Sequence, residues 1–438
     1  MKRVLIITYY WPPSGGSGVQ RWLKMSKYLP ENGWQPVIYT AENAEYPVED
    51  PSLEKDVCPE AEVIRRPIVE PYNYYKKLLG IKKDQKVKAG FIDESGKQKG
   101  WKERLSVWVR GNFFIPDARC WWVKPSVKYL KAYLKDHPVD AIVSTGPPHS
   151  MHLIAMKLKE ALNLPWIADF RDPWTEIDYY DDLHLTRWAD RKHRRLEHKV
   201  LTQADKIAGV GWDMAEGLER LGAKHVDVIP NGFDWEPQAN PEATHLSSEF
   251  TLTHIGIIGA NRNEHQLWQA LGELKAFDSQ FASKLKIRLI GQVDQSVALS
   301  IESCNLQDNT EFISYIPHDQ IQQQQASSQV LLLFVNNTPN AKGILTGKLF
   351  EYIAAGRPIL CIGPEDGDAA RIISETESGV TVGFEEKEKM KTVIKDLYER
   401  YLGNRLPSNE NAEIEKYSRK ALAWEFAKLL EKAQMQTE

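Results

Sequence analysis

Short apolar runs alternate with segments of helical periodicity, and this alternation occurs twice along the chain. A stretch from Phe233 to Phe250, rich in Pro, Asn, Glu and Ser, separates the two series and is typical of a linker. Apolar strands divided by helices are characteristic of parallel sheets covered on both faces. The sequence therefore predicts an α/β fold with two Rossmann-like, doubly wound domains. The main strands are predicted at residues 3–8, 37–40, 63–66, 140–144 and 166–169, then at 252–258, 287–290, 330–334 and 358–362.

The composition limits the class of protein. The 438 residues suffice for two domains of about 200 residues each. A net charge of −4 does not favour general binding to nucleic acid. The 4 cysteines show no CxxC spacing, which indicates a reducing compartment and neither a disulfide framework nor a zinc site. Without an apolar run of about 18 residues or a signal-peptide core, we expect a cytoplasmic protein.

The stretch from Gly343 to Leu360 combines a glycine-containing loop with a short helix predicted at 348–355, which Gly356 ends. Lys348 lies at the start of this helix, where free N–H groups and the helix dipole favour an anion. Glu351 lies one turn in and can accept hydrogen bonds from a ribose diol. Ordinary capping charges would explain the same two residues.

The first strand is followed by the loop PPSGGSG and by a helix that starts near Val19. Gly15 and Gly16 would let a diphosphate approach the backbone closely. The spacing does not match GxGxxG, which argues against a dinucleotide fingerprint. Arg21, just inside the helix, either contacts phosphate or is solvated.

Further candidate residues follow strands in both halves. His149 follows the strand at 140–144, where open α/β sheets place their ligands, although an ordinary helix-start histidine would occupy the same place. Arg171 and Asp172 follow the strand at 166–169. Arg262 lies at the start of a helix in the second half and is a candidate for binding phosphate.

The segment from Lys76 to Arg110 is basic, with eleven Lys or Arg residues against four acids, and Trp, Phe and Leu are interleaved. Such a segment suits the surface of an anionic membrane. Binding to RNA and a solvated insertion are the alternatives.

Two segments, KLFEYIAAGRPIL and VIPNGFD, resemble the retaining GT-B glycosyltransferases, the glycosyltransferase family 4-like group also called group 1. That family often has two glutamates eight positions apart. Glu351 matches the second, while residue 343 is Gly, as in the subgroup with a KLFEY segment. Arg171 stands where many members have a His, and Asp172 matches the Asp after it. Arg262 matches a diphosphate-clamping Arg, but the usual Lys a few residues later is missing.

The resemblance implies a GT-B architecture with two domains that face a central cleft. The N-terminal acceptor-side domain would span residues 1–235 and the nucleotide-sugar-binding domain 236–412. A C-terminal helix within 413–438 would pack back towards the first domain. The implied reaction transfers a sugar from a nucleotide-sugar donor, expected to be UDP-linked, to an acceptor hydroxyl with retention, in polysaccharide or glycolipid synthesis. Neither a metal nor another cofactor is expected.

The resemblance also distributes the candidate residues between two roles. His149, Arg171 and Asp172 would serve catalysis, and the donor would be bound by Gly15, Gly16, Arg262, Lys348 and Glu351. The expected partners are the donor and a glycan or lipid-linked acceptor, with peripheral contact at the inner face of the membrane through residues 76–110 and no nucleic acid. Three alternatives remain: a GT-B-fold sugar-nucleotide epimerase, a dinucleotide oxidoreductase and a non-catalytic sugar-nucleotide-binding protein.

Overall fold

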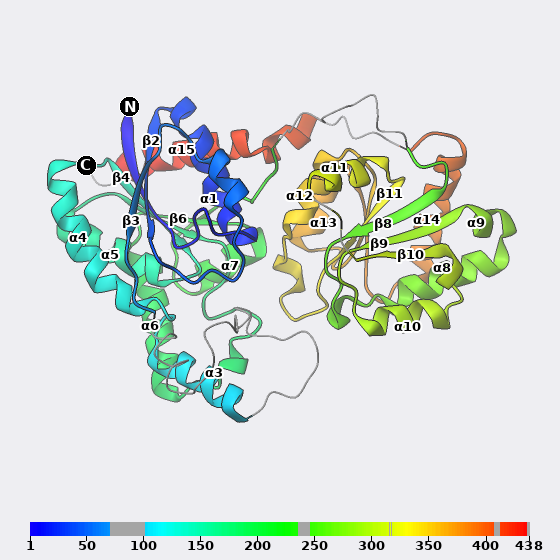
Figure 1. Cartoon of the computed structure of the whole chain (residues 1–438), viewed down its shortest axis with the longest axis horizontal. Helices are drawn as coiled ribbons and strands as arrows, with labels where there is room; N and C mark the ends of the chain where they lie inside the picture. The colour runs from blue at the N-terminus through cyan, green and yellow to red at the C-terminus, as the bar shows by residue number, and fades with distance from the viewer. Residues whose placement is uncertain (71–100, 235–245, 315, 317, 407–411, 436–438) are drawn as a thin grey trace. The chain divides into compact units, whose positions relative to one another are not determined.

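The computed structural model describes residues 1–70, 101–234, 246–314, 316, 318–406 and 412–435, which divide into two compact units (Figure 1). Unit 1 comprises the chain up to Asn231 and again from Arg419 onward, and unit 2 runs from Gly232 to Ser418. The sequence predicts the corresponding boundaries at 235/236 and 412/413.

Unit 1 contains a seven-stranded parallel sheet with the order β3-β2-β1-β4-β5-β6-β7. The strand order reverses between β1 and β4, so the loops that follow these two strands flank a topological switch point, where α/β sheets bind their ligands. The strands are β1 (Lys2–Ile7), β2 (Trp34–Ala41), β3 (Glu62–Arg66), β4 (Ala141–Gly146), β5 (Trp166–Phe170), β6 (Lys206–Gly209) and β7 (Val226–Val228).

Helices cover both faces of this sheet, because its central strands are apolar on both sides. Leu5 and Ile7 of β1 belong to one hydrophobic core, whereas Val4 and Ile6, which alternate with them, belong to another. The helices are α1 (Ser17–Tyr28), α3 (Trp101–Phe113), α4 (Val123–Asp136), α5 (Ser150–Leu162), α6 (Arg187–Gln203), α7 (Trp212–Arg220) and α15 (Arg419–Met435).

The C-terminal helix α15 packs against α1, as the red and blue helices of unit 1 show in Figure 1. Phe426 meets Trp22 of α1 edge to face, with ring centroids 4.9 Å apart. Leu422, Leu429 and Leu430 belong to the same core. The last helix of the chain therefore completes the unit that the first strand begins.

Unit 2 contains a six-stranded parallel sheet with the order β10-β9-β8-β11-β12-β13, and its switch point lies between β8 and β11. The sequence predicts four of these strands; the structure adds the edge strands β10 and β13. Both have mixed, half-exposed sequences, TEFI and GVTV, because only one neighbour covers an edge strand. The strands are β8 (Phe250–Ile255), β9 (Leu285–Ile290), β10 (Thr310–Ile313), β11 (Val330–Phe334), β12 (Ile359–Ile362) and β13 (Gly379–Val382).

The helices of unit 2 also lie on both faces of their sheet. Figure 1 shows α12 and α13 on one side and α8 and α10 on the other, and α14 packs along α8. The two parallel sheets with their helices confirm the predicted α/β class. Within the described ranges, no helix is both long and apolar enough to cross a membrane. The helices are α8 (His265–Phe277), α9 (Ser279–Lys284), α10 (Gln295–Ser303), α11 (His318–Ser327), α12 (Gly347–Ala354), α13 (Asp368–Glu375) and α14 (Lys387–Leu402).

Candidate functional site

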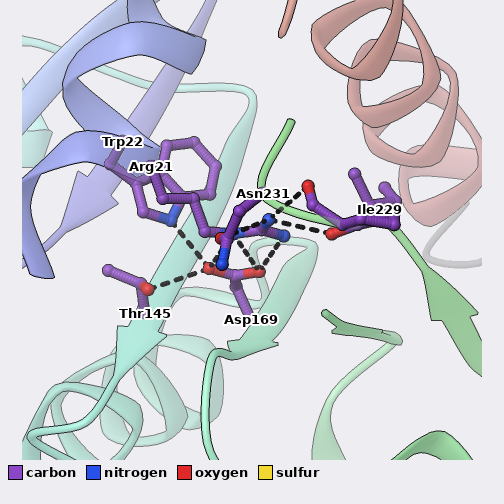
Figure 2. A network of polar contacts seen from close by, with 7 residues as sticks. Arg21, Trp22, Thr145, Asp169, Ile229 and Asn231 are labelled. Atoms are coloured by element: carbon purple, nitrogen blue, oxygen red, sulfur yellow. Dashed lines mark hydrogen bonds and ion pairs between the residues drawn. The ribbon is translucent and has the colours of Figure 1, made fainter. Parts of the chain in front are cut away.

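A buried polar network surrounds Asp169 near the carboxyl end of β5 (Figure 2). The carboxylate accepts hydrogen bonds from Arg21 Nη2 at 2.7 Å, Trp22 Nε1 at 2.8 Å and Thr145 Oγ1 at 2.8 Å. Burial alone would raise the pKa of Asp169, but the Arg21 charge and these donors outweigh burial and lower it. Asp169 is therefore a paired carboxylate in the interior of unit 1.

Arg21 also binds the last residues of unit 1 before the chain enters unit 2. Its Nη1 donates to the carbonyls of Ile229 at 2.8 Å and Pro230 at 2.9 Å, and to Asn231 Oδ1 at 3.4 Å (Figure 2). The residue is only 3% exposed. Both expectations for Arg21, phosphate contact and solvation, are therefore wrong. Its guanidinium connects α1 with β5 and with the last residues before the chain enters unit 2.

The two glycines after β1 have different surroundings. The Gly15 N–H donates to the Val48 carbonyl at 2.9 Å, so a hydrogen bond within unit 1 already uses it. Gly16 is exposed, has φ 80° and directly precedes α1. Apart from its two chain neighbours, no described residue has an atom within 4 Å of the place where a Cβ would be. The left-handed backbone favours glycine here, and the start of α1 beside it is open.

Arg171 connects the two loops at the switch point of unit 1. Its Nη1 donates to the Gly18 carbonyl at 2.6 Å, its Nη2 donates to the Pro147 carbonyl, and its guanidinium lies 5.7 Å from the centre of the Tyr10 ring. Arg171 therefore holds the start of α1 against the loop after β4. Asp172 follows with an exposed side chain.

His149 lies between β4 and α5, as the sequence predicts, and its imidazole is buried. The ring stacks on Trp174 with centroids 4.7 Å apart and 5° between the planes. Its Nδ1 has no hydrogen-bond partner among the described residues. Burial, aided by His152 and Arg171, holds the pKa of His149 well below its ordinary value, so the ring is neutral at pH 7.

His152, one turn further along α5, is a residue that sequence reasoning missed. Its Nδ1 lies 2.8 Å from Ser144 Oγ, which also accepts a hydrogen bond from Trp166 Nε1. Burial lowers the pKa of His152 to about 3. A Cβ on Gly146 would lie 2.9 Å from His149 Nδ1 and 2.5 Å from His152 Nε2, so both imidazoles converge on the end of β4.

In unit 2, Lys348 and Arg262 both lie near the carboxyl end of β8. A Cβ on Gly256, the residue after this strand, would collide with the Lys348 side chain. Arg262 donates to Asn336 Oδ1, which follows β11, and to the Ile257 carbonyl at 3.1 Å. Burial and the charges of Lys348 and Arg262 lower the pKa of the buried His254 of β8 to about 3. Two cations therefore flank the switch point of unit 2.

Glu351 lies on the exposed side of α12, where Gln325 Nε2 of α11 approaches its Oε2 to 3.4 Å. The next residue, Tyr352, is buried, and its hydroxyl accepts the Ile255 N–H at 3.0 Å. This bond fixes α12 against the end of β8, with Lys348 in the first turn and Glu351 one turn later. The unit thus presents a cation and a carboxylate along one short helix beside its switch point.

Part of the sequence-predicted set lies near the switch point of each unit. Gly16, His149 and Arg171 lie around the switch point of unit 1, and Arg262, Lys348 and Glu351 lie near that of unit 2. The sequence offered a signal for Thr145 and Asp169, because both occur at strand ends. Within the described part of the chain, no cluster of three or more His, Cys, Asp or Glu side chains could hold a metal ion.

Residues 97–232 match the family described as the glycosyl transferase 4-like domain. This match contains the His149, Asp169 and Arg171 region of unit 1 and supports the resemblance to glycosyltransferases. No curated protein sequence matches the chain.

Solved structures share the fold along nearly the whole chain. A glycosyltransferase from Rickettsia africae is 12% identical, with a TM-score of 0.63, and 99% of this chain and 98% of that chain are covered. A sucrose-phosphate synthase from Thermosynechococcus elongatus is 14% identical, with a TM-score of 0.61 and 98% of each chain covered. Anabaena HepE, solved with UDP-glucose, is 13% identical, with a TM-score of 0.57, and 98% of this chain and all (100%) of that chain are covered. These likenesses support the predicted GT-B architecture as a fold.

Proposed function

We propose that the protein is a glycosyltransferase that moves a sugar from a UDP-linked donor to an acceptor hydroxyl with retention at the anomeric carbon. The observation that carries this proposal is the arrangement in unit 2 of Arg262, Lys348 and Glu351 around the end of β8. Two cations and the start of α12 suit a diphosphate, and a carboxylate one turn later suits a ribose diol. The glycosyl transferase 4-like match over residues 97–232 supports the same activity.

The chemistry requires little more than a stabilised leaving group. The acceptor oxygen forms a bond to the anomeric carbon, the bond from that carbon to the diphosphate oxygen breaks, and the acceptor proton passes to the leaving phosphate. Negative charge grows on the nucleoside diphosphate, and fixed cations such as Arg262 and Lys348 stabilise it in the transition state. His149 and Asp172 are proposed to face the reacting sugar, and Arg171 a phosphate or a sugar hydroxyl.

A donor assay tests this function. UDP-glucose, UDP-galactose and UDP-N-acetylglucosamine are each incubated with the protein, with and without a lipid-linked or oligosaccharide acceptor, and the products are separated. We expect UDP release to depend on the acceptor and the new bond to keep the donor's anomeric configuration by NMR. A changed nucleotide sugar without acceptor would indicate an epimerase, and binding without turnover a non-catalytic binding protein.

We further propose that the acceptor is used at an anionic membrane surface. Residues 76–100 of the predicted membrane segment lie outside the described residues, but the rest belongs to α3, which contacts α6. We take the exposed aromatic and basic residues of these two helices, together with Trp121, as the aromatic and basic face of unit 1. The side chains of Phe113, Trp121 and Trp188 are more than half exposed, and Lys192 Nζ lies 4.9 Å from the centre of the Trp188 ring. Trp and Phe beside Lys and Arg suit the interface of a bilayer.

Helix α6 contributes a row of cations to this face. Arg187, Arg191, Arg195 and Lys199 are exposed and recur every four residues, so they follow one side of the helix. Each Lys or Arg of this row that lies near an anionic surface would contribute about 1 kcal/mol to the free energy of membrane binding.

A further inference from the structure

A cavity of about 420 Å³ opens in unit 2, between the loop that leads into α8 and the loop that follows β13. Asn261 and Glu264 line it from the first loop, Gln266 from the first turn of α8, Phe384 and Glu385 from the second loop, and Asn337 from the segment after β11. The donor-binding proposal uses none of these side chains. The cavity is therefore a separate feature of the same carboxyl-end edge of the sheet.

Glu264 is the unusual member of the lining. The residue is 5% exposed, and its carboxyl makes no hydrogen bond or ion pair with any described residue. Burial, together with the charge of Glu385, raises the pKa of Glu264 to about 8. The carboxyl forms part of the cavity wall, so the hydrogen-bond partner that it lacks within the described protein would come from whatever fills the cavity.

The neighbouring polar groups are already held in place. Gln266 Nε2 donates to Glu385 Oε2 at 3.0 Å, and Trp268 Nε1 donates to Asn263 Oδ1 at 3.0 Å. Ser300 Oγ lies 3.0 Å from His265 Nδ1. Hydrogen bonds within the unit therefore hold Asn263, His265, Gln266 and Glu385, whereas the Glu264 carboxyl has no partner among the described residues.

The lining selects the chemical class of the occupant. None of the described residues that line the cavity is a Lys or an Arg, and Glu385 opposes an anion, so a phosphate is a poor fit. An apolar molecule would leave the Glu264 carboxyl without a partner. A sugar hydroxyl both donates and accepts, which matches side-chain amides and a carboxyl, and the ring of Phe384 can pack on the C–H face of a pyranose.

We propose that this cavity is a subsite for a neutral pyranose, which hydrogen-bonds to Glu264 and to the side-chain amides around it. The pyranose comes from one of two sources. It is the sugar of the nucleotide donor, in which case the inference rests on the proposed function, or it is a sugar unit of a free glycan, in which case it does not.

Binding measurements on the full chain test the subsite without requiring turnover. The probes are methyl α-D-glucopyranoside, methyl α-D-galactopyranoside and N-acetylglucosamine, titrated by saturation-transfer NMR, and UDP and UDP-glucose, titrated by calorimetry. The variants are Glu264→Leu, which removes the polar group, and Glu264→Gln, which keeps a neutral hydrogen-bonding group of similar shape. Glu273→Gln, an exposed position on α8 that pairs with Lys387, is the matched control.

We expect Glu264→Leu to lower the affinity for at least one pyranose probe by about tenfold, which corresponds to the loss of one buried hydrogen bond. The affinities of Glu264→Gln and Glu273→Gln should stay within about threefold of wild type. Weaker binding of UDP-glucose with unchanged binding of UDP assigns the pyranose to the donor. Weaker binding of a free glycoside with unchanged binding of UDP-glucose assigns it to a glycan.

Two results would overturn the inference. One is equal affinity of wild type and Glu264→Leu for every probe, with the fold of the variant intact by circular dichroism. The other is that spermidine or Mg²⁺ binds to wild type but not to Glu264→Gln, which would make the cavity a cation site. Loss of UDP binding alone would count against the donor site and not against this subsite, because the glycoside titrations contain no nucleotide.

Discussion

Arg21 Nη2 and Asp169 Oδ1 lie 2.7 Å apart, and their side chains are 1% and 0% exposed. This ion pair connects the first helix of the chain with the centre of its first sheet, and Arg21 extends the connection to the carbonyls of Ile229 and Pro230. Because the charges are buried, each depends on the other, and the loss of either would leave an uncompensated charge inside the protein. The pair is therefore a structural element near the switch point rather than a group that is available to a ligand.

Replacing Arg21 by Met should destabilise unit 1 by about 3–5 kcal/mol, since the Asp169 carboxylate would stay buried without its cation. Hydrogen exchange of peptides from α1 and β5 measures this locally, whereas one melting temperature would average over two units. Arg220→Met, which breaks an exposed pair with Glu176, should cost about 0–1 kcal/mol. Similar protection in both variants would contradict the role assigned to Arg21.

The buried histidine His152 should make unit 1 less stable in acid. Its pKa is about 3 in the folded protein and about 6.5 in an unfolded chain, so the unfolded state binds more protons between these values. Stability should then fall as pH drops below about 6.5, by roughly 1.4 kcal/mol per pH unit. Urea denaturation from pH 7 to 4 should show a shallower slope for His152→Gln than for wild type. The exposed His225→Gln should keep the wild-type slope, and a match between the two variants would refute the assignment.

Loss of Lys348 should weaken the binding of UDP much more than the binding of uridine, because the lysine is proposed to bind the diphosphate. Loss of Glu351 should lower the affinity for both ligands by about tenfold to a hundredfold, since a charge-assisted hydrogen bond is worth about 1.5–3 kcal/mol. Glu351→Gln should fall between wild type and Glu351→Ala. Calorimetry gives these affinities. Lys342→Ala, an exposed lysine paired with Asp366, is the control and should change little. Unchanged affinity in a folded Glu351→Ala variant would mean that α12 is only scaffold.

Asp172→Ala should lower turnover far more than it weakens donor binding. His149 needs a more careful comparison, because its ring also packs on Trp174. His149→Phe keeps an aromatic ring for that stack and removes both nitrogens, so a fall in kcat with unchanged stability would indicate a chemical role. Wild-type kcat in both His149→Phe and Asp172→Ala would show that the catalytic role has been assigned to the wrong residues.

The aromatic and basic face of unit 1 should bind anionic vesicles. We expect the protein to sediment with phosphatidylglycerol vesicles at low salt, and less at high salt, where charge attraction is screened. Trp188→Ala combined with Arg191→Ala should reduce pelleting, whereas Trp424→Ala, an exposed Trp on α15, should not. Equal pelleting with neutral and anionic vesicles would rule out the electrostatic contact.

The sequence predicted the central strands well, because a strand buried on both faces is a continuous apolar run, as in the VLLLF of β11. It missed β10 and β13, whose residues are half exposed at the sheet edges. Strand ends located His149 and Arg171, but the sequence could not show that Gly15 donates its N–H to Val48 or that Arg21 is buried. Those outcomes depend on contacts between residues far apart in the chain, which neither periodicity nor a local motif encodes. The buried Glu264 is likewise an ordinary helix-start acid in the sequence.

The packing of α15 on α1 has a consequence for the order of events during synthesis. Unit 1 begins with the first strand, yet the apolar surface around Trp22 is not covered until Phe426 and its neighbours leave the ribosome. Between the two lie all the residues of unit 2, which take roughly 10–40 s to translate. During that time unit 2 can form its own core, while the nascent first unit exposes an incomplete one. Until α15 is made, the apolar side of α1 therefore stays available to a chaperone that binds such surface.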